Sequence, residues 1–159
     1  MFKNLRADLE FSLSIKRAES GVYQYLKILL NPRFFPILIF RTAFFANRSF
    51  ITKPVALFLN LFNKIVFGID IPLALKIGPG VYFPHPQNIV LGAEKIGSKC
   101  VIYHGVTLGA KFLDFEYCKN TRPIIEDSVI IGCNSTIIGP EVIESGARLR
   151  PHSLIRSRK

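Results

Sequence analysis

Three polar residues at related places in this chain could together remove a proton from a hydroxyl group. His85 and His104 each lie two positions after a large apolar residue, and Asp70 lies one position before another. A histidine acts as a general base when a carboxylate holds its ring in one tautomer and stabilises the charged form. Because the ordinary pKa of histidine is about 6.5, an imidazole can accept a proton near neutral pH. The three residues therefore predict base-assisted attack of a hydroxyl on an activated carbonyl.

A repeat of six residues is the feature that would bring these side chains together. Neither a helix, with a period near 3.6, nor a strand, with a period near 2, repeats every six residues. A strict period of six is typical of a hexapeptide solenoid, in which three units complete one triangular coil. The aliphatic positions of the C-terminal part are Ile125, Ile131, Ile137, Ile143, Leu149 and Ile155. The earlier ones are Ile71, Ile77, Phe83, Val90, Ile96, Ile102 and Leu108, with one seven-residue step between Phe83 and Val90.

Counting coils along this repeat predicts a column of polar groups. Three hexapeptide units separate His85 from His104, so His104 should lie one coil above His85, about 4.8 Å away as in neighbouring strands. Asp70 should lie one coil below His85. Two other interpretations remain open from spacing alone. The residues could be ordinary exposed side chains, or the two stacked histidines could bind a metal ion, although no third ligand is apparent and we expect no metal.

The remaining elements divide the chain in two. We predict an α+β fold in which an α-helical N-terminal domain, residues 1–68, precedes a β-helix domain, residues 69–159. An extended loop at about 110–123 leaves the repeat, and such a loop is usually a lid or a binding element. Pro54 fits the first turn of the last helix, and Gly68 ends it. The four expected helices cover residues 5–17, 22–30, 33–47 and 53–66.

The net charge of +10 is concentrated in the helical part. Residues 1–69 contain ten Lys or Arg and three acids, and nine of the 14 Phe lie between Phe34 and Phe67. A nucleic-acid partner is not expected, because no recognition motif accompanies the charge. No apolar run is long enough to span a bilayer. Peripheral membrane contact stays open beside packing between helices and subunits. Three cysteines without metal spacing and a charged N-terminus indicate a cytoplasmic protein, with the inner face of the membrane as an alternative location.

The residues around the histidines resemble a known family. The run "YHGVTLGA", the fifteen-residue spacing from Asp70 to His85, and the N-terminal runs "LRADLE" and "FRTAFF" are similar to serine acetyltransferases, a group of hexapeptide acyltransferases. The resemblance implies a left-handed parallel β-helix and a homotrimer, with pairing of two trimers left open. It also implies acetyl-CoA as donor and a site between subunits. By this resemblance His85 is the general base and Asp70 the residue that orients it.

Two departures from the family bear on the acceptor. Arg122 stands where the family has a histidine after the extended loop, and Pro84 replaces an aspartate before His85. A guanidinium suits a carboxylate or another anion better than an amino group. We therefore expect Arg122 and His104 to line the acceptor site, and Arg148 and Arg150 to contact the phosphates of CoA.

These departures favour one function and leave two alternatives. The favoured function is an acetyl-CoA-dependent O-acetyltransferase that acts on a saccharide hydroxyl in surface (capsular or exo-) polysaccharide biosynthesis. The first alternative is a serine O-acetyltransferase of cysteine biosynthesis. The second is a non-catalytic, membrane-associated β-helix scaffold.

Overall fold

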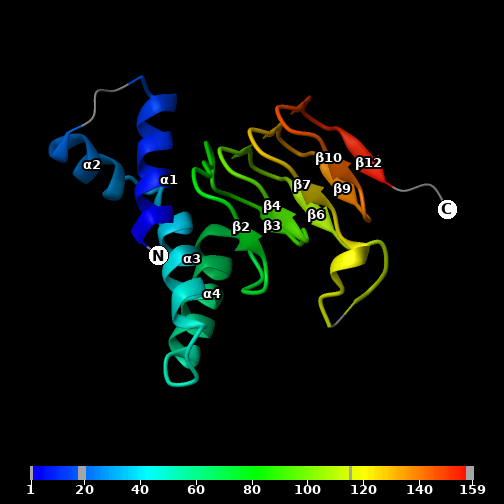
Figure 1. Ribbon diagram of the computed structural model, residues 1–159, viewed down its shortest axis with the longest axis horizontal. Coiled ribbons are helices and arrows are strands. Elements are labelled where there is room, and N and C mark those ends of the chain that lie inside the picture. Colours follow the sequence, from blue (N-terminus) through cyan, green and yellow to red (C-terminus); the bar gives the residue numbers. More distant parts are fainter. Residues whose placement is uncertain (1, 18–20, 115, 157–159) are drawn as a thin grey trace.

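The structure consists of a helical part followed by a coil of short strands. It is a computed structural model that describes residues 2–17, 21–114 and 116–156 (Figure 1). The helices are α1 (Phe2–Ile15), α2 (Val22–Leu29), α3 (Phe35–Ala46) and α4 (Lys53–Phe67). As predicted, Pro54 lies in the first turn of α4, and Gly68 ends the helix in the left-handed conformation with φ 63°. The polypeptide enters the first strand directly after this residue.

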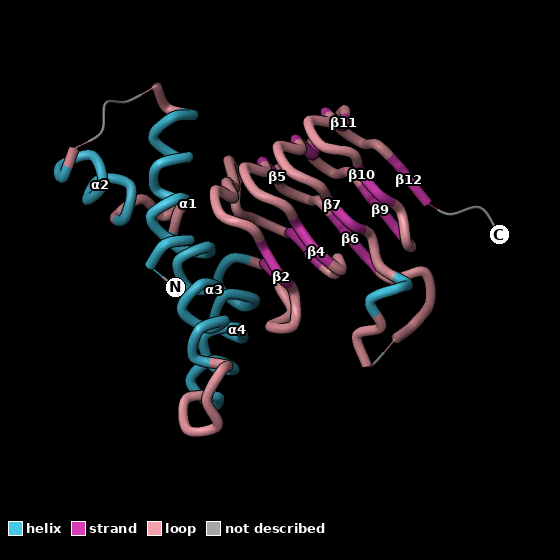
Figure 2. The backbone as a smooth tube through the Cα atoms, viewed as in Figure 1, coloured by secondary structure: helices cyan, strands magenta, loops and turns pink. Residues whose placement is uncertain are grey.

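The strands are two or three residues long and wind into a triangular coil (Figure 2). Within the described ranges they form three parallel sheets, with orders β1-β3-β6-β9-β12, β10-β7-β4-β2 and β11-β8-β5. After the first turn, which has only the isolated bridge of Tyr82 with Val101 on the third side, each full turn of the chain adds one strand to each sheet, as the six-residue period predicts. The first six strands are β1 (Ile69–Asp70), β2 (Lys76–Ile77), β3 (Ile89–Leu91), β4 (Lys95–Ile96), β5 (Val101–Ile102) and β6 (Thr107–Gly109). The others are β7 (Ile124–Ile125), β8 (Ile130–Ile131), β9 (Thr136–Ile138), β10 (Val142–Ile143), β11 (Arg148–Leu149) and β12 (Leu154–Arg156).

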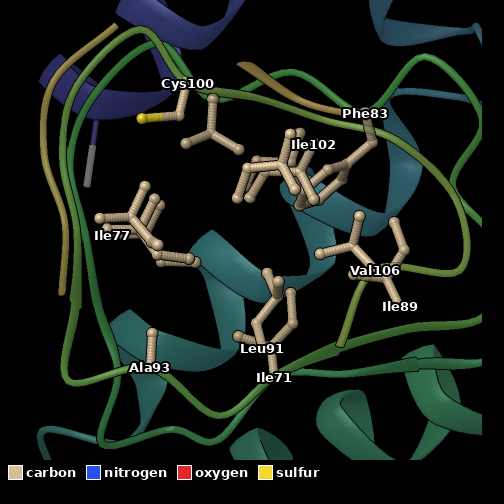
Figure 3. Close-up of a cluster of buried hydrophobic side chains, with 14 of the residues drawn as sticks. Ile71, Ile77, Phe83, Ile89, Leu91, Ala93, Cys100, Ile102 and Val106 are labelled. Carbon is tan, nitrogen blue, oxygen red and sulfur yellow. The ribbon is translucent and has the colours of Figure 1, made fainter. Parts of the chain in front are cut away.

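The aliphatic positions of the repeat form the interior of the coil. Ile71, Ile77 and Ile102 point inward together with Phe83, and each is at most 6% exposed (Figure 3). Isoleucine and leucine at successive coils stack on one another, so the core is a continuous apolar column. Burial of an aliphatic side chain contributes about 1.5–3 kcal/mol, which is why the repeat tolerates few departures.

One expected core position is wrong. We predicted Val90 inside the coil, but its side chain is 40% exposed, whereas Ile89 and Leu91 are fully buried. In the register of β3 with β6, Val90 lies opposite Thr107 and Leu91 opposite Leu108. The step between core residues is therefore eight, from 83 to 91, followed by a step of five, from 91 to 96. The extra residues form a wider corner, and this corner carries His85.

A buried ion pair joins the helical part to the first coil. Asp8 of α1 is fully buried and accepts hydrogen bonds from Arg41 of α3, with distances of 2.9 Å to Nε and 3.1 Å to Nη2. The same carboxylate accepts from the backbone N–H groups of Gly80 and Val81, at 2.7 and 3.0 Å. Arg41 also donates to the carbonyl of Ile77 at 2.7 Å. This cluster fixes two helices against the coil, and the sequence pattern did not reveal it.

Candidate active site

His85 and His104 lie next to each other at one corner of the coil. Their ring centroids are 5.7 Å apart and the rings are nearly perpendicular, at 85°. His85 is exposed and His104 is half-buried. Among the described residues, Nδ1 of His104 is buried and has no hydrogen-bond partner. The contact between the rings agrees with the coil count, which placed the two histidines one above the other.

The backbone around His85 is held by the turn that widens this corner. Pro84 and Pro86 flank the histidine and restrict its conformations. The N–H of Gln87 donates to the carbonyl of His85 at 2.9 Å, and the carbonyl of Gln87 accepts from Gly105 in the next coil at 3.2 Å. These restraints present the imidazole of His85 outward from a rigid support, as a catalytic base requires.

Asp70 does not touch His85 in this structure. Its carboxylate accepts a hydrogen bond from Nζ of Lys64 at 2.7 Å, and within the described part of the chain no hydrogen bond joins it to His85. The reason is local, because α4 ends immediately before β1 and brings Lys64 beside Asp70. Two members of the expected column, His85 and His104, are in contact, whereas Asp70 pairs with Lys64. The orienting role of Asp70 stays a prediction.

A cavity of about 260 Å³ opens beside His85. Its walls come from the loop before α3, with Pro32 and Arg33, and from the end of α4, with Val66 and Phe67. The turn that carries His85 completes it, with Pro86 and Gln87. The helical part therefore forms walls of a small cavity that His85 also lines. The sequence pattern did not indicate Arg33 as a site residue, although Arg33 lies in the segment 21–69, which contains no Asp or Glu.

Arg122 lies elsewhere and is engaged within its own loop. The loop leaves the coil after β6 and returns through a short 3-10 helix, Lys119–Thr121, to β7 (Figure 1). Arg122 is 9% exposed, and Nη2 binds Asp114 at 2.5 Å while Nη1 donates to the carbonyl of Gly92 at 2.9 Å. Its guanidinium also lies over the ring of Tyr117, 3.9 Å from the centroid. Arg122 does not line the cavity of His85.

Asp114 is the centre of this loop. Besides Arg122, it accepts hydrogen bonds from the backbone N–H groups of Tyr117 and Cys118, each at 3.1 Å, and from the hydroxyl of Thr121 at 3.2 Å. The hydrogen bond from Arg122 holds the pKa of Asp114 below its ordinary value. Burial raises the pKa of Tyr117 to about 12. Since the pKa of Asp114 is lowered on folding, its contribution to stability is present above about pH 3.9 and is lost as the pH falls through the lowered value.

Replacing Asp114 by asparagine should loosen the loop. Asparagine cannot pair with the charge of Arg122, which would then remain buried without a counter-ion. We expect trypsin to cleave after Lys119 at least about threefold faster than in the unmodified chain, because local opening exposes the backbone. Glu116→Gln is the matched control, since Glu116 is an exposed acid of the same loop. Equal cleavage of Asp114→Asn and the control would show that Asp114 does not hold the loop.

The residues expected at the donor site lie at the far end of the coil. Arg148, in β11, and Arg150 are both exposed. A second cavity, of about 320 Å³, extends from Tyr103 across Ile130 and Cys133 to Leu149 and Pro151. Cys133 lies one coil beyond His104, because Ile102 of β5 pairs with Ile131 of β8. This second cavity therefore runs across neighbouring coils, from Tyr103, which precedes His104, to Leu149, which lies between the two arginines in the sequence.

The cysteines do not form a metal site. Among the described residues, no group of three His, Cys, Asp or Glu side chains could hold a metal ion. All three cysteines are free. Cys100 is buried, and burial raises the pKa of its thiol to about 11. Cys118, by contrast, is exposed and Cys133 half-buried.

Comparison with known proteins relates this chain to serine acetyltransferases. No family model matches the sequence. A serine acetyltransferase of Mycobacterium tuberculosis (strain ATCC 25618 / H37Rv) is 32% identical over 95 residues, covering 59% of this chain and 40% of that protein. The serine acetyltransferase of Helicobacter pylori (strain J99 / ATCC 700824) is 26% identical over 156 residues, 94% of this chain and 87% of that protein.

Solved structures agree with these relatives. Neisseria gonorrhoeae serine acetyltransferase superposes with a TM-score of 0.79 at 29% identity, covering 98% of this chain and 59% of that one. A serine acetyltransferase in complex with CoA gives a TM-score of 0.78 at 25% identity, covering 96% of this chain and 60% of that one. This chain thus spans about three-fifths of these two solved chains. The α+β fold with a left-handed β-helix is confirmed.

The comparisons contradict the polysaccharide acetyltransferase that we favoured. The relatives described above are named serine acetyltransferases, which supports the first alternative instead. We inferred a saccharide acceptor largely from Arg122, which we took to be an unpaired cation that contacts the acceptor. Because Asp114 and the carbonyl of Gly92 already bind that guanidinium, its presence carries no information about the acceptor.

Proposed function

We propose that this chain is an acetyl-CoA-dependent serine O-acetyltransferase with His85 as its general base. The observation that carries the proposal is the exposed imidazole of His85, which is fixed by its turn, contacts His104 and opens on a small cavity. The likeness to serine acetyltransferases over nearly the whole chain supplies the reaction and the acceptor.

In the proposed mechanism His85 first accepts a proton from the acceptor and later donates a proton to the leaving group. Its free ring nitrogen takes the proton of the serine hydroxyl while the hydroxyl oxygen attacks the thioester carbonyl. A tetrahedral oxyanion forms and then collapses, so that the carbon–sulfur bond breaks and the acetyl group stays on the serine oxygen. The imidazolium of His85 returns its proton to the departing sulfur, and the base is regenerated.

The two neighbours of His85 have distinct roles in this proposal. The ring of His104 packs edge-on against that of His85 and limits its rotation. Asp70 is the orienting carboxylate. Its ion pair with Lys64 is partly exposed on both sides, at 37% for Asp70 and 58% for Lys64, and such pairs contribute little to stability. Asp70 can therefore exchange Lys64 for the imidazolium that forms during the reaction.

The donor would occupy the second cavity. Its walls include apolar side chains such as Ile130 and Leu149, which suit the chain of a thioester substrate. The exposed Arg148 and Arg150 near its far end suit the phosphates. In this proposal the thioester would lie near His104 and His85, and the phosphates near the end of the coil.

The proposal keeps the homotrimer that the resemblance implies, with pairing of trimers open, and a cytoplasmic location. Apolar residues on two faces of the β-helix are available for contact between subunits, since Val142 is 51% and Leu154 is 64% exposed. Exposed aliphatic residues on strands often mark such an interface.

Identification of the product tests the proposed function. The purified chain is incubated with acetyl-CoA and L-serine, and the amino acid is analysed by mass spectrometry. We expect O-acetyl-L-serine, and none with the acceptor or the enzyme omitted. Absence of acetylated serine at millimolar serine, with an enzyme that still folds, would contradict the proposal.

A further inference from the structure

The cavity beside His85 contains a cation that the structure leaves unpaired. Arg33 lines this cavity together with His85 and Gln87, and no acidic residue lines it. Among the described residues, the guanidinium of Arg33 has no ion pair, in contrast to those of Arg41 and Arg122. The electrostatic character of this cavity is therefore positive on one wall and neutral on the others.

The backbone at Arg33 is fixed although its side chain is exposed. Its N–H donates to Oδ1 of Asn31 at 3.0 Å, which forms a tight turn before α3. The following residue, Phe34, is 4% exposed and anchors the loop in the apolar core. Arg33 thus lines the cavity from a fixed turn, and its guanidinium has no hydrogen bond to a described residue, so that its fork of donors is available.

From this geometry we infer that Arg33 binds the carboxylate of the amino acid acceptor. The inference rests on the proposed function and assigns a specificity residue to it. A guanidinium binds a carboxylate through two parallel hydrogen bonds and fixes its orientation. A carboxylate held at Arg33 would leave the serine hydroxyl facing His85 across a cavity of about 260 Å³. Arg33 would therefore be the cation of the acceptor site, a place that we first assigned to Arg122.

Steady-state kinetics of Arg33→Gln tests this assignment. We expect the KM for L-serine to rise at least about tenfold, because a charged hydrogen-bond pair is lost. The KM for acetyl-CoA should not change, and kcat should change far less than the KM for serine. L-Serinamide, which lacks the carboxylate, should be used equally well by the variant and the unmodified enzyme. Arg48→Gln is the matched control, because Arg48 lies over the rings of Phe44 and Phe45 and not in this cavity.

The outcomes separate this inference from the proposed function. If the unmodified enzyme acetylates L-serine and Arg33→Gln has the same KM for it, the role of Arg33 is wrong while the function stands. An equal loss with serine and serinamide would also refute the inference, because the effect would not depend on the carboxylate. If the unmodified enzyme does not acetylate serine at all, the proposed function itself fails.

An independent observation concerns the exposed face of α4. Ala56 and Asn63 of this helix are buried, and α4 packs on α3, but other positions of α4 carry exposed apolar side chains. Val55, Phe58, Phe62 and Ile65 follow one another at spacings of three and four, and their side chains are 42–73% exposed. The tip between α3 and α4 adds Phe50 and Ile51, at 92% and 85% exposed. Burying such residues in an apolar phase is favourable by about 1.5–3 kcal/mol each.

The charges around this α4 face indicate what covers it. Residues 21–69 contain no Asp or Glu, and the exposed cations Arg48 and Lys53 flank the tip. A second copy docked through the same face would bring like charges together without an acid to pair them. An anionic lipid surface offers both an apolar layer and negative charge. None of the described helices is long and apolar enough to cross a membrane, so contact would be peripheral. We propose that the tip and the α4 face dock on an anionic membrane.

Vesicle flotation tests this docking. The full chain should float with phosphatidylcholine vesicles that contain phosphatidylglycerol at low salt, and less with phosphatidylcholine alone or at high salt. Phe50→Ser combined with Ile51→Ser should lower the bound fraction at least about tenfold, because two inserted side chains are lost. Phe112→Ser combined with Leu113→Ser is the matched control, since these residues are 67% and 93% exposed on the other loop.

Three results would overturn membrane docking. The chain would fail to float with the anionic vesicles, or the tip variant would float as well as the unmodified chain. In the third, the unmodified chain does not bind vesicles, and the tip variant differs from it in oligomeric state when both are compared by sedimentation without vesicles. That result would assign the face to a second copy of the chain.

Discussion

His85→Ala is expected to lower kcat for the acetylation of L-serine by about 10²- to 10⁴-fold, the usual contribution of a general base. The imidazole is exposed at the corner of the coil and packs against His104, and in the proposed mechanism it carries the proton in both directions. The KM for acetyl-CoA should change little, because the donor lies along the second cavity. Thiol release from acetyl-CoA, recorded at saturating substrates, measures the effect.

A second histidine provides the control for this prediction. His152 is exposed, and its backbone has φ 60°, a conformation that asparagine tolerates. His152→Asn should retain normal turnover and normal stability. If His85→Ala kept more than about a tenth of the activity, a general-base role for His85 would be untenable. A similar loss in both variants would instead indicate a general effect on the fold.

Asp8→Ala is expected to destabilise the fold by about 3–5 kcal/mol, because it leaves Arg41 as a buried charge without a counter-ion. The substitution also removes the acceptor of two backbone N–H groups, those of Gly80 and Val81. Denaturant unfolding, followed by circular dichroism, should show a lower midpoint. Since natural domains are stable by about 5–15 kcal/mol, this loss brings the helical part close to unfolding.

Glu10→Gln is the control for the buried pair. Glu10 forms an ion pair with Arg6 on the same helix, but both side chains are exposed, at 48% and 79%. Solvent screens such a pair, so the denaturation midpoint should hardly change. An unchanged midpoint in Asp8→Ala would contradict the view that this cluster fixes the helices to the coil.

The fold was predictable because its determinants are periodic and local. Ile125 and the five aliphatic residues that follow it at six-residue steps specify the coil, and Pro54 and Gly68 mark the ends of α4. The error at Val90 arose where the period changes, since steps of eight and five span the same thirteen residues as the expected steps of seven and six. Periodicity does not reveal how an irregular corner distributes its extra residues.

The site was predictable only in part, for a physical reason. The contact of His85 with His104 follows from counting coils, because both lie on the same regular scaffold. The partners of Asp70, Arg122 and Arg33 depend on α4, on the long loop and on the turn before α3, whose positions the repeat does not determine. Arg122 was therefore assigned to the acceptor from its residue type and from the family histidine that it replaces, and its actual partner, Asp114, lies eight residues away in the same loop.

The most direct test of the central claim is the rate of thiol release from acetyl-CoA with L-serine, compared with saccharide acceptors and with no acceptor. If His85 activates a serine hydroxyl in the cavity that Arg33 also lines, the rate of thiol release should depend on L-serine and saturate with it. Saccharides should leave the background rate of thiol release unchanged. A rate that rises with a saccharide and not with L-serine would contradict the assignment of this chain as a serine acetyltransferase.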